Sequence, residues 1–388
     1  MFIYPDFLTD FKCIGSDCLN TCCNGWSVGL DETAADYYER LGGEFGDFVR
    51  QNVFREPSTN KITGIKPGKG NYCPFLNEKG LCRIQIECGE EHLGSICQNY
   101  PRHEYGNDNI SILGVVTSCD AVLAILDKRT QPVFLRTAGE KDLSLSEPDD
   151  NTILELAHFI SWGMELLQDE SIPFGAALST VLYVAFEIQS PFEQQDFKRV
   201  DTILLQAPEI LAQFIQTSET LDPLETEKAA WKFISGVIES FCQILPRTAN
   251  AYKPEELIWN PDLMRQTSEE RRRFLMTSWH ALKSDKQHAS FVRKFAATCF
   301  LHHALQFPVS EYLSNLCTAI ILMEILPLTW KSPEQLDKRV YFSRLSLLSR
   351  WFEQSNSFND HLQSVLKDSF SPNLFTYAIA FMVLFDLR

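Results

Sequence analysis

The residues of this chain best suited to chemistry are cysteines, and they crowd toward one end of the sequence. Nine of the twelve cysteines fall within the first 119 of 388 residues. Four of these nine, Cys13, Cys18, Cys22 and Cys23, fall within eleven residues, among glycine, serine, aspartate and asparagine. Apolar burial, which is common for free cysteine, gives no reason for such a cluster. The pattern therefore indicates disulfides, a zinc site or an iron–sulfur cluster.

The start of the sequence favours metal binding over disulfides. The opening residues, M-F-I-Y-P-D-F-L-T-D-F-K, lack the basic segment and apolar run of a secretory signal. No uninterrupted apolar run in the chain reaches the ~18 residues expected of a membrane span. We therefore expect a cytoplasmic protein without a membrane partner. In a reducing cytoplasm, such cysteines are metal ligands or reactive thiols.

The number of cysteines leaves more than one arrangement open. Neighbouring pairs such as Cys13 and Cys18, or Cys18 and Cys22, are spaced closely enough to chelate one metal. With Cys88 set aside, the eight other N-terminal cysteines nevertheless exceed the four that one zinc ion or one cubane cluster needs. Either two sites exist, or some thiols support the ligands or carry out redox chemistry. Adjacent Cys22 and Cys23 are poorly placed to share one metal ion, whereas a cluster of several irons accommodates both.

The overall composition argues against one large class of function. The chain carries 35 Lys and Arg against 51 Asp and Glu, a net charge of −16. Nucleic-acid-binding proteins need a basic surface, so we expect no nucleic-acid partner. At ~150 residues per domain, the length indicates two or three domains.

The hydrophobic pattern predicts a mainly α protein in two parts. We expect a small cysteine-rich α+β module at residues 1–135 and an all-α helical bundle at residues 145–388, separated by a polar connection within 130–150. The module is predicted to contain helices at 31–41 and 44–54, a loop or hairpin at 55–72, a β-hairpin at 72–86, a helix at 90–100, a strand at 109–116, and a helix from 119 capped by Ser118 or Asp120. The bundle is predicted to contain helices at 151–168, 173–188, 192–216, 225–245, 268–282, 291–306, 309–326, 333–351, 357–369 and 372–387.

The ordered motifs around the cysteines resemble a known family. They run C-x4-C-x3-C-C-x2-W, C-P-F-L, G-L-C-x-I, G-E-E-x-L, C-x2-Y-P-R, and then S-C before an apolar helix. This order, over roughly residues 10–130, resembles the flagellin lysine-N-methylase family and a wider group of zinc- or iron-chelating cysteine domains. The motifs are specific in combination, although no single one would be.

The resemblance implies an activity, cofactors and a ligand set. It implies a cytoplasmic enzyme that transfers a methyl group from S-adenosylmethionine to lysine ε-amines of flagellin. It also implies an iron–sulfur cluster, most simply 4Fe–4S with zinc as the alternative. The cysteines at the family's positions are Cys13, Cys18, Cys22, Cys23, Cys73, Cys82, Cys97 and Cys119. We expect the remaining cysteines to be ordinary buried or free thiols: Cys88, Cys242, Cys299 and Cys317.

The residues themselves do not show how a methyl donor binds. There is no G-x-G-x-x-G loop after a strand, and the strand-like Gly114 stands alone. A radical-type C-x3-C-x2-C would need cysteine at position 25, where the chain has Gly25. One hypothesis is that an iron left open by an incomplete cysteine set binds the amino and carboxylate groups of the donor.

Polar residues near Cys97 are candidates for binding donor or substrate. Glu91, Tyr100 and Arg102 lie close to Cys97 in sequence, and a carboxylate or tyrosine could help to deprotonate a lysine amine. The plainer interpretation is that Glu90 and Glu91 favour a helix start, and that Tyr100 and Arg102 follow its end. The sequence identifies no catalytic residue.

The histidines have similar alternatives. His92 or His103 could replace a thiolate ligand, whereas His302 and His303 are expected to be one surface and one core residue.

Two other functions remain open at this point. The module could be a non-catalytic, metal-stabilised scaffold for protein binding. It could also be a redox or metal-handling protein that uses the adjacent cysteines.

Overall fold

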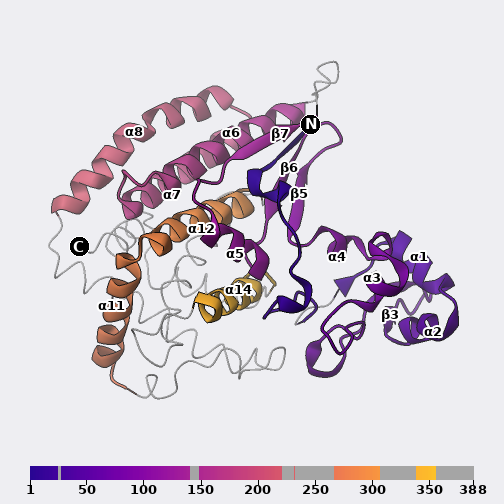
Figure 1. The fold of residues 1–388 in the computed structure, drawn as a ribbon. Coiled ribbons are helices and arrows are strands. Elements are labelled where there is room, and N and C mark those ends of the chain that lie inside the picture. The colour runs from indigo at the N-terminus through magenta and orange to yellow at the C-terminus, as the bar shows by residue number, and fades with distance from the viewer. Residues whose placement is uncertain (25–27, 140–147, 221–230, 232–265, 306–337, 355–388) are drawn as a thin grey trace.

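The computed structural model describes residues 1–24, 28–139, 148–220, 231, 266–305 and 338–354. Helices dominate these residues, and strands are confined to positions before residue 139 (Figure 1). The predicted fold class, mainly α with an α+β N-terminal part, is therefore confirmed. The helices predicted at 309–326, 357–369 and 372–387 lie outside the described residues, as does the helix at 225–245 apart from residue 231.

A four-stranded sheet draws together distant parts of the N-terminal region. Its strand order is β5-β6-β1-β7, with β1 parallel to β6 and the other neighbours antiparallel. Only β6 was predicted, because only its sequence is rich in β-branched residues. The connection at 130–150 was predicted without a strand, yet it contains β7, which pairs with β1. The strands are β1 (Phe2–Pro5), β5 (Arg102–Gly106), β6 (Ser111–Val115) and β7 (Leu135–Ala138).

The main helices follow the predicted segments closely. In Figure 1, α6, α7 and α8 lie side by side, and α12 crosses beneath them. Helix α12 packs against α6, α5 and β6, so one hydrophobic core joins the sheet to the helices. No helix within the described ranges is long and apolar enough to cross a membrane. The helices are α5 (Asp120–Lys128), α6 (Pro148–Gln168), α7 (Phe174–Glu193), α8 (Phe197–Thr220), α11 (Ser268–Ser284), α12 (Lys286–Ala304) and α14 (Lys338–Gln354).

Aromatic packing fixes α12 against α6. The rings of Phe159 on α6 and Phe300 on α12 meet edge to face, with centroids 5.3 Å apart. Both side chains are fully buried, and each removes a large apolar area from water. Gly163 of α6 lies directly against the Phe300 ring, where no side chain would fit.

Residues 28–99 form a separate small lobe, seen on the right of Figure 1. It has its own hydrophobic core, in which Tyr38, Val49 and Phe75 are almost completely buried. A three-stranded antiparallel sheet of order β2-β4-β3 supports the helices. The elements are β2 (Val28–Gly29), α1 (Glu32–Arg40), α2 (Gly43–Gln51), β3 (Val53–Arg55), β4 (Ile62–Ile65), α3 (Arg83–Cys88) and α4 (Ser95–Asn99).

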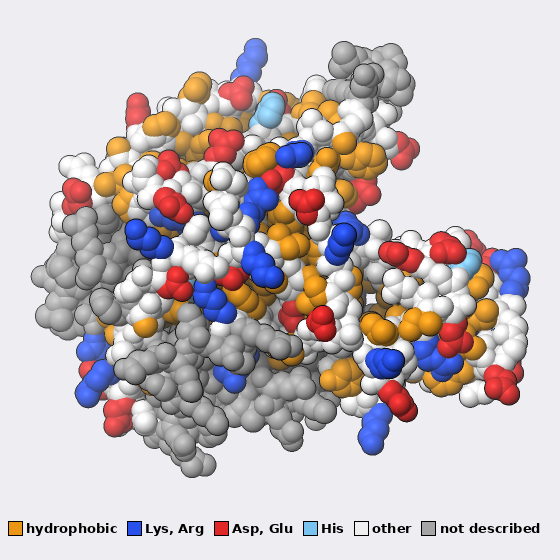
Figure 2. Space-filling view, in the orientation of Figure 1, with side chains coloured by type: hydrophobic (Ala, Val, Ile, Leu, Met, Phe, Trp, Pro, Cys, Tyr) orange, Lys and Arg blue, Asp and Glu red, His pale blue; other side chains and the backbone are white. Residues whose placement is uncertain are grey.

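The small lobe also stands out from the main body in the space-filling view. Figure 2 shows basic, acidic and hydrophobic side chains interspersed over the visible face of the lobe. Three of its large hydrophobic side chains are exposed, namely Phe54, Ile86 and Ile96. Because charges of both signs are interspersed on the face that Figure 2 shows, that face of the lobe forms no single-sign surface.

The predictions in this lobe were partly right. Helix α1 begins as predicted, because the Asp31 carboxylate accepts a hydrogen bond from Ala34 N. The loop or hairpin at 55–72 takes the form of a hairpin, since β3 pairs with β4. The β-hairpin predicted at 72–86 was wrong, because only an isolated bridge joins Leu76 to Cys82 before α3 begins. The helix predicted at 90–100 is broken at Gly94 into a 3₁₀ turn and α4.

Candidate metal centre

Four cysteines approach one another at the edge of the small lobe, and we refer to them as the first thiol group: Cys23, Cys73, Cys82 and Cys97. The main chain already joins two of them, since Cys73 N donates to Cys23 O at 2.7 Å. Cys73 and Cys82 stand at the two ends of a turn, and Cys97 lies on α4. The last three pack against the core of the lobe.

Burial and mutual repulsion both disfavour ionised thiols in the first thiol group. Burial raises the pKa of Cys73 and of Cys97 to about 12, and the neighbouring thiols add to the effect. For Cys82, burial likewise raises the pKa, with a further contribution from Cys23. In an apolar site, several thiolates become stable together only when a cation compensates their charge.

A second thiol group lies at the N-terminus of α5 and consists of Cys13, Cys18 and Cys119. Cys119 is the residue before the helix; burial raises its pKa to about 11, partly offset by the N–H groups of Val122 and Ala121. Burial also raises the pKa of Cys18, and Asp120 and Cys119 raise it further. Cys13 is exposed, and its thiol lies near enough to Cys119 to add to the rise in the pKa of Cys119.

Cys22 connects the two thiol groups. Its side chain is hydrogen-bonded to that of Cys23, which is the main reason why the pKa of Cys23 is raised. Cys22 and Cys119 both lie near enough to Tyr100 to contribute to the raised pKa of its phenol, of which burial is the main cause. The eight predicted ligands are therefore distributed over two neighbouring groups with Cys22 between them.

The donor atoms suit a thiophilic metal, although they do not converge tightly on one point. Cysteine thiolate is the preferred ligand of both zinc and iron–sulfur clusters. Within the described part of the chain, no three Cys, His, Asp or Glu side chains are close enough to hold a metal ion. A metal would have to bring the thiols closer together, and its charge would offset the burial and mutual repulsion that raise their pKa values.

The remaining cysteines differ from one another. Cys88 packs against the same small core as the first thiol group, and its thiol contributes to the raised pKa of Cys82. It therefore lies closer to that group than we expected. The side chain of Cys88 is hydrogen-bonded to Tyr37. Cys299 is buried on α12, with its sulfur 3.6 Å from Thr117 Oγ1. Cys242 and Cys317 lie outside the described residues.

The three residues suggested for donor or substrate binding do not converge. Tyr100 lies between the thiol groups, with its hydroxyl 3.3 Å from Ser118 Oγ. Burial raises the pKa of Tyr100 well above its usual value, so its hydroxyl stays protonated at neutral pH. Glu91 is largely exposed, and the Arg102 guanidinium lies 5.2 Å from the ring centre of Phe11.

The histidines make contacts with other rings. His92 stacks on Tyr37 with centroids 3.7 Å apart, and His103 meets His302 edge to face at 4.4 Å. The expectation of one surface and one core residue at 302–303 was wrong, since His302 and His303 are both buried. The strand β5 contacts α12 there, so that helix turn is covered on more than one face.

Asp120 takes a part that the sequence did not indicate. Neither it nor Ser118 caps α5, whose first residue follows Cys119 without a side-chain cap. The Asp120 carboxylate instead accepts hydrogen bonds from Leu19 N at 2.9 Å and Asn20 N at 3.0 Å. It therefore fixes the main chain between Cys18 and Cys22 against the start of α5, directly after Cys119.

Three further residues escaped sequence reasoning, namely Asn20, Ser346 and Arg350. The only signal for the last two was a polar spacing of three within a predicted helix, S-R-L-S-L-L-S-R at 343–350. That spacing places Ser343, Ser346 and Ser349 on one face of α14. The identity of their partners depends on contacts more than 200 positions away.

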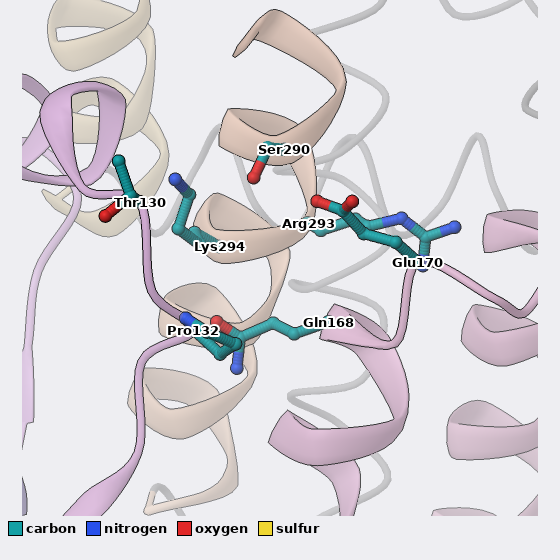
Figure 3. Close-up of a pocket in the computed structure, with 7 residues that line it drawn as sticks. All are labelled: Thr130, Pro132, Gln168, Glu170, Ser290, Arg293 and Lys294. Carbon is teal, nitrogen blue, oxygen red and sulfur yellow. The ribbon is translucent and has the colours of Figure 1, made fainter. Parts of the chain in front are cut away.

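A polar cavity of about 240 Å³ lies beyond the opposite end of α5 (Figure 3). From α12, Lys294 points toward Thr130 and Arg293 points toward Glu170. Arg293 donates to the carbonyls of Leu167, Asp169 and Ile172, and Lys294 donates to that of Arg129. These groups join two loops to α12, which is a structural role. The lining residues are Thr130, Pro132, Gln168, Glu170, Ser290, Arg293 and Lys294.

Comparison with known proteins adds a relationship over part of the chain. No family model and no solved structure matches it. Over 109 residues, 27% of its length, it is 35% identical to the flagellar biosynthetic protein FliU of Salmonella muenchen and covers 64% of that protein. Over 109 residues it is also 34% identical to the lysine-N-methylases of Salmonella choleraesuis strain SC-B67 and Salmonella typhimurium strain LT2, covering 27% of each.

The match thus spans less than two thirds of the first relative and about a quarter of the other two. The names of these relatives agree with the family that the cysteine motifs indicated. Over about a quarter of its length, this chain is similar to proteins named lysine-N-methylase and flagellar biosynthetic protein, as the flagellin lysine-N-methylase resemblance predicted.

Proposed function

We propose that the chain is a cytoplasmic methyltransferase that modifies lysine ε-amines of flagellin. The methyl donor is S-adenosylmethionine, and the cysteines hold an iron–sulfur cluster. The observation that carries the proposal is the gathering of eight cysteines from positions 13 to 119, seven in two adjacent groups and Cys22 between them. The names of the relatives, lysine-N-methylase and flagellar biosynthetic protein, support the reaction and the substrate.

The first thiol group would supply four ligands to a cluster, most simply 4Fe–4S, with zinc as the alternative. With all four thiolates bound, such a centre would supply redox chemistry; with only three bound, it would leave one iron open for the amino and carboxylate groups of the donor. The low dielectric of the half-buried site would strengthen its interaction with any charged group of donor or substrate. The thiolates of the second thiol group and of Cys22 would lie beside this cluster.

Tyr100 is the residue best placed to act on a bound molecule. It lies beside Cys22 and Cys119, and its protonated hydroxyl can donate a hydrogen bond. It therefore suits orientation of a carboxylate or carbonyl better than removal of a proton from lysine. The deprotonated amine would then have to come from desolvation of the substrate lysine, which lowers its pKa.

Methyl transfer from S-adenosylmethionine to flagellin tests the proposal. Anaerobically prepared protein would be incubated with both, and mass gains of one methyl per modified lysine would be read by mass spectrometry. A Cys97→Ser variant serves as the cluster-deficient control. No mass gain with intact cluster and folded flagellin would refute the activity. Full activity in metal-free protein would refute the role of the cluster while leaving the methylation in place.

One observation favours a second function, a metal-stabilised scaffold. Cys73, Cys82 and Cys97 pack against the core of the small lobe, where a metal would add to a small number of buried apolar side chains. Small domains often rely on such a metal for stability. Colourless protein with stoichiometric zinc and no transfer activity would support this function, whereas a broad absorbance band near 400 nm, typical of iron–sulfur clusters, would support the first.

A further inference from the structure

A buried arginine from the far end of the described chain holds the loop between Cys18 and Cys22. Arg350 on α14 is 1% exposed. Its Nη1 donates to Thr21 O at 2.8 Å, and its Nη2 donates to Asn20 O at 2.7 Å. The same Nη2 donates to Ser118 O, the residue before Cys119, at 3.2 Å. One side chain thus ties the cysteine loop to the start of α5.

A second set of bonds joins the same three segments. The Asn20 amide donates to Ser343 Oγ at 2.9 Å and to Ser346 Oγ at 3.0 Å, both on α14. Ser346 Oγ in turn donates to Asp120 Oδ1, while Asp120 Oδ2 accepts from the main chain of residues 19 and 20. The loop, α5 and α14 therefore form one continuous polar network inside the protein.

The charge of Arg350 is as significant as its hydrogen bonds. A buried guanidinium costs several kcal/mol of desolvation unless anions lie near it. The Asp120 carboxylate supplies one negative charge to the network, and Asn20 links it to Arg350, because Asn20 N donates to Asp120 while Asn20 O accepts from Arg350. The Cys18 and Cys23 thiols also lie within electrostatic reach of Arg350. A thiolate-held centre would add negative charge at this position.

We propose that Arg350 is the positioning residue of the cysteine centre. It holds residues 18–22 in the conformation that aligns the thiols, and its fixed positive charge compensates the thiolates of the loaded centre. The charge role rests on the proposed metal function, whereas the loop-holding role does not. An arginine suits both roles because its planar fork donates to several carbonyls at once while it stays charged at any physiological pH.

The test compares three variants on the same helix. Arg350→Gln removes the fork and the charge, Arg350→Lys keeps only the charge, and Lys338→Gln removes a charge whose ion pairs are with Asp127 and Asp285. In reduced, metal-free protein, alkylation of Cys18 and Cys22 would be followed by mass spectrometry. We expect Arg350→Gln to accelerate it roughly tenfold through local opening, with Lys338→Gln unchanged and Arg350→Lys in between.

In protein with a bound cluster, the reduction potential tests the charge of Arg350 separately from its effect on packing. With a cluster reconstituted, Arg350→Gln should lower the reduction potential, because a nearby positive charge favours the reduced form, and Arg350→Lys should restore most of it. If Arg350→Gln fails to fold, Asn20→Ala tests the loop-holding role, since it removes the bonds from the loop to Ser343 and Ser346.

The outcomes separate this proposal from the proposed function. Wild-type alkylation rates in a folded Arg350→Gln variant, or in Asn20→Ala where the first fails to fold, would overturn the loop-holding role. An unchanged potential would overturn the charge role. A wild-type protein that takes up neither iron nor zinc would overturn the metal function and with it the charge role, while the alkylation rates would still decide the loop-holding role.

Discussion

The imidazole of His302 on α12 lies against that of His103 on β5, with its Nδ1 3.2 Å from Nε2 of His103. The two rings cross at nearly a right angle, 86°. Burial lowers the pKa of His103 to about 4 and that of His302 well below its usual value. The sheet therefore meets the helices through a pair of neutral histidines.

This pair should make stability depend on mild acid. Between pH 6.5 and about 4, the unfolded histidines bind protons that the folded ones exclude, so stability should fall as pH falls through this window. The loss is at most about 1.4 kcal/mol per pH unit for each histidine. Urea unfolding at pH 7.5 and 5.5 measures it. A His302→Asn variant should show a smaller difference between the two pH values, whereas the exposed His158→Asn should match the wild type. Equal pH dependence in all three proteins would contradict the assignment.

Gly114 of β6 should not tolerate a side chain. A Cβ at this position would overlap Cε1 of His103, so the ring would have to move within a closed interface. Gly114→Ala should destabilise the protein by about 1–3 kcal/mol, as overpacking of a core typically does. Gly29→Ala is the matched control, because its Cβ would meet only Ile96 Cδ1 at 3.9 Å. Thermal unfolding measures both, and equal midpoints would disprove the steric role of Gly114.

Individual cysteines should differ in their effect on metal content. Cys97→Ser should lose most of the bound iron or zinc per chain, since it removes a member of the first thiol group. Cys299→Ala should retain the metal and lose only packing, because its thiol lies on α12 beside Thr117. Cys88→Ser should also retain it, although Cys88 packs against the same core as Cys97. Metal analysis of the three variants decides this, and a complete loss in Cys88→Ser would make Cys88 a ligand.

Metal removal should open the small lobe and leave the main core closed. Arg83, between Cys82 and Cys88, is held by an ion pair with Glu87 and by the face of Phe45. After chelation, trypsin should cut at Arg83 faster, because metal binding and folding of such lobes are coupled. Arg293 in the main core, bonded to three carbonyls, should stay protected. Cleavage at Arg83 at the same rate with and without chelator would show that the lobe folds independently of metal.

Tyr100→Phe should reduce methyl transfer without changing metal content. The substitution removes one hydroxyl at the thiol groups and keeps the ring, so the fold should persist. A loss of one donated hydrogen bond to a bound group typically costs about 0.5–1.5 kcal/mol, or several-fold in rate. Glu91→Gln should have little effect, because that carboxylate is largely exposed. Transfer rates at saturating donor decide the matter, and equal rates for Tyr100→Phe and wild type would remove Tyr100 from the site.

The sequence by itself determined the local elements of this protein. The helical pattern located α6, α7, α11 and α12 to within about five residues at each end. Helices α7 and α12 bury residues on all faces along much of their length. Asp31 marked the start of α1 through a bond to a residue only three positions away. The crowding of cysteines before residue 120 also indicated the region of the candidate site, since chelation requires several thiols in one place.

Only the tertiary structure decided how these elements meet. Strands β1 and β7 carry weak local signals, and they exist because β1 pairs with both β6 and β7, each more than 100 positions away in the chain. The division of the cysteines into two thiol groups follows from where α4 and α5 are placed, which no spacing encodes. Arg350 reaches Thr21 across 329 positions. Such contacts depend on which surfaces remain to be covered once the local elements have formed, and that is a property of the packed chain.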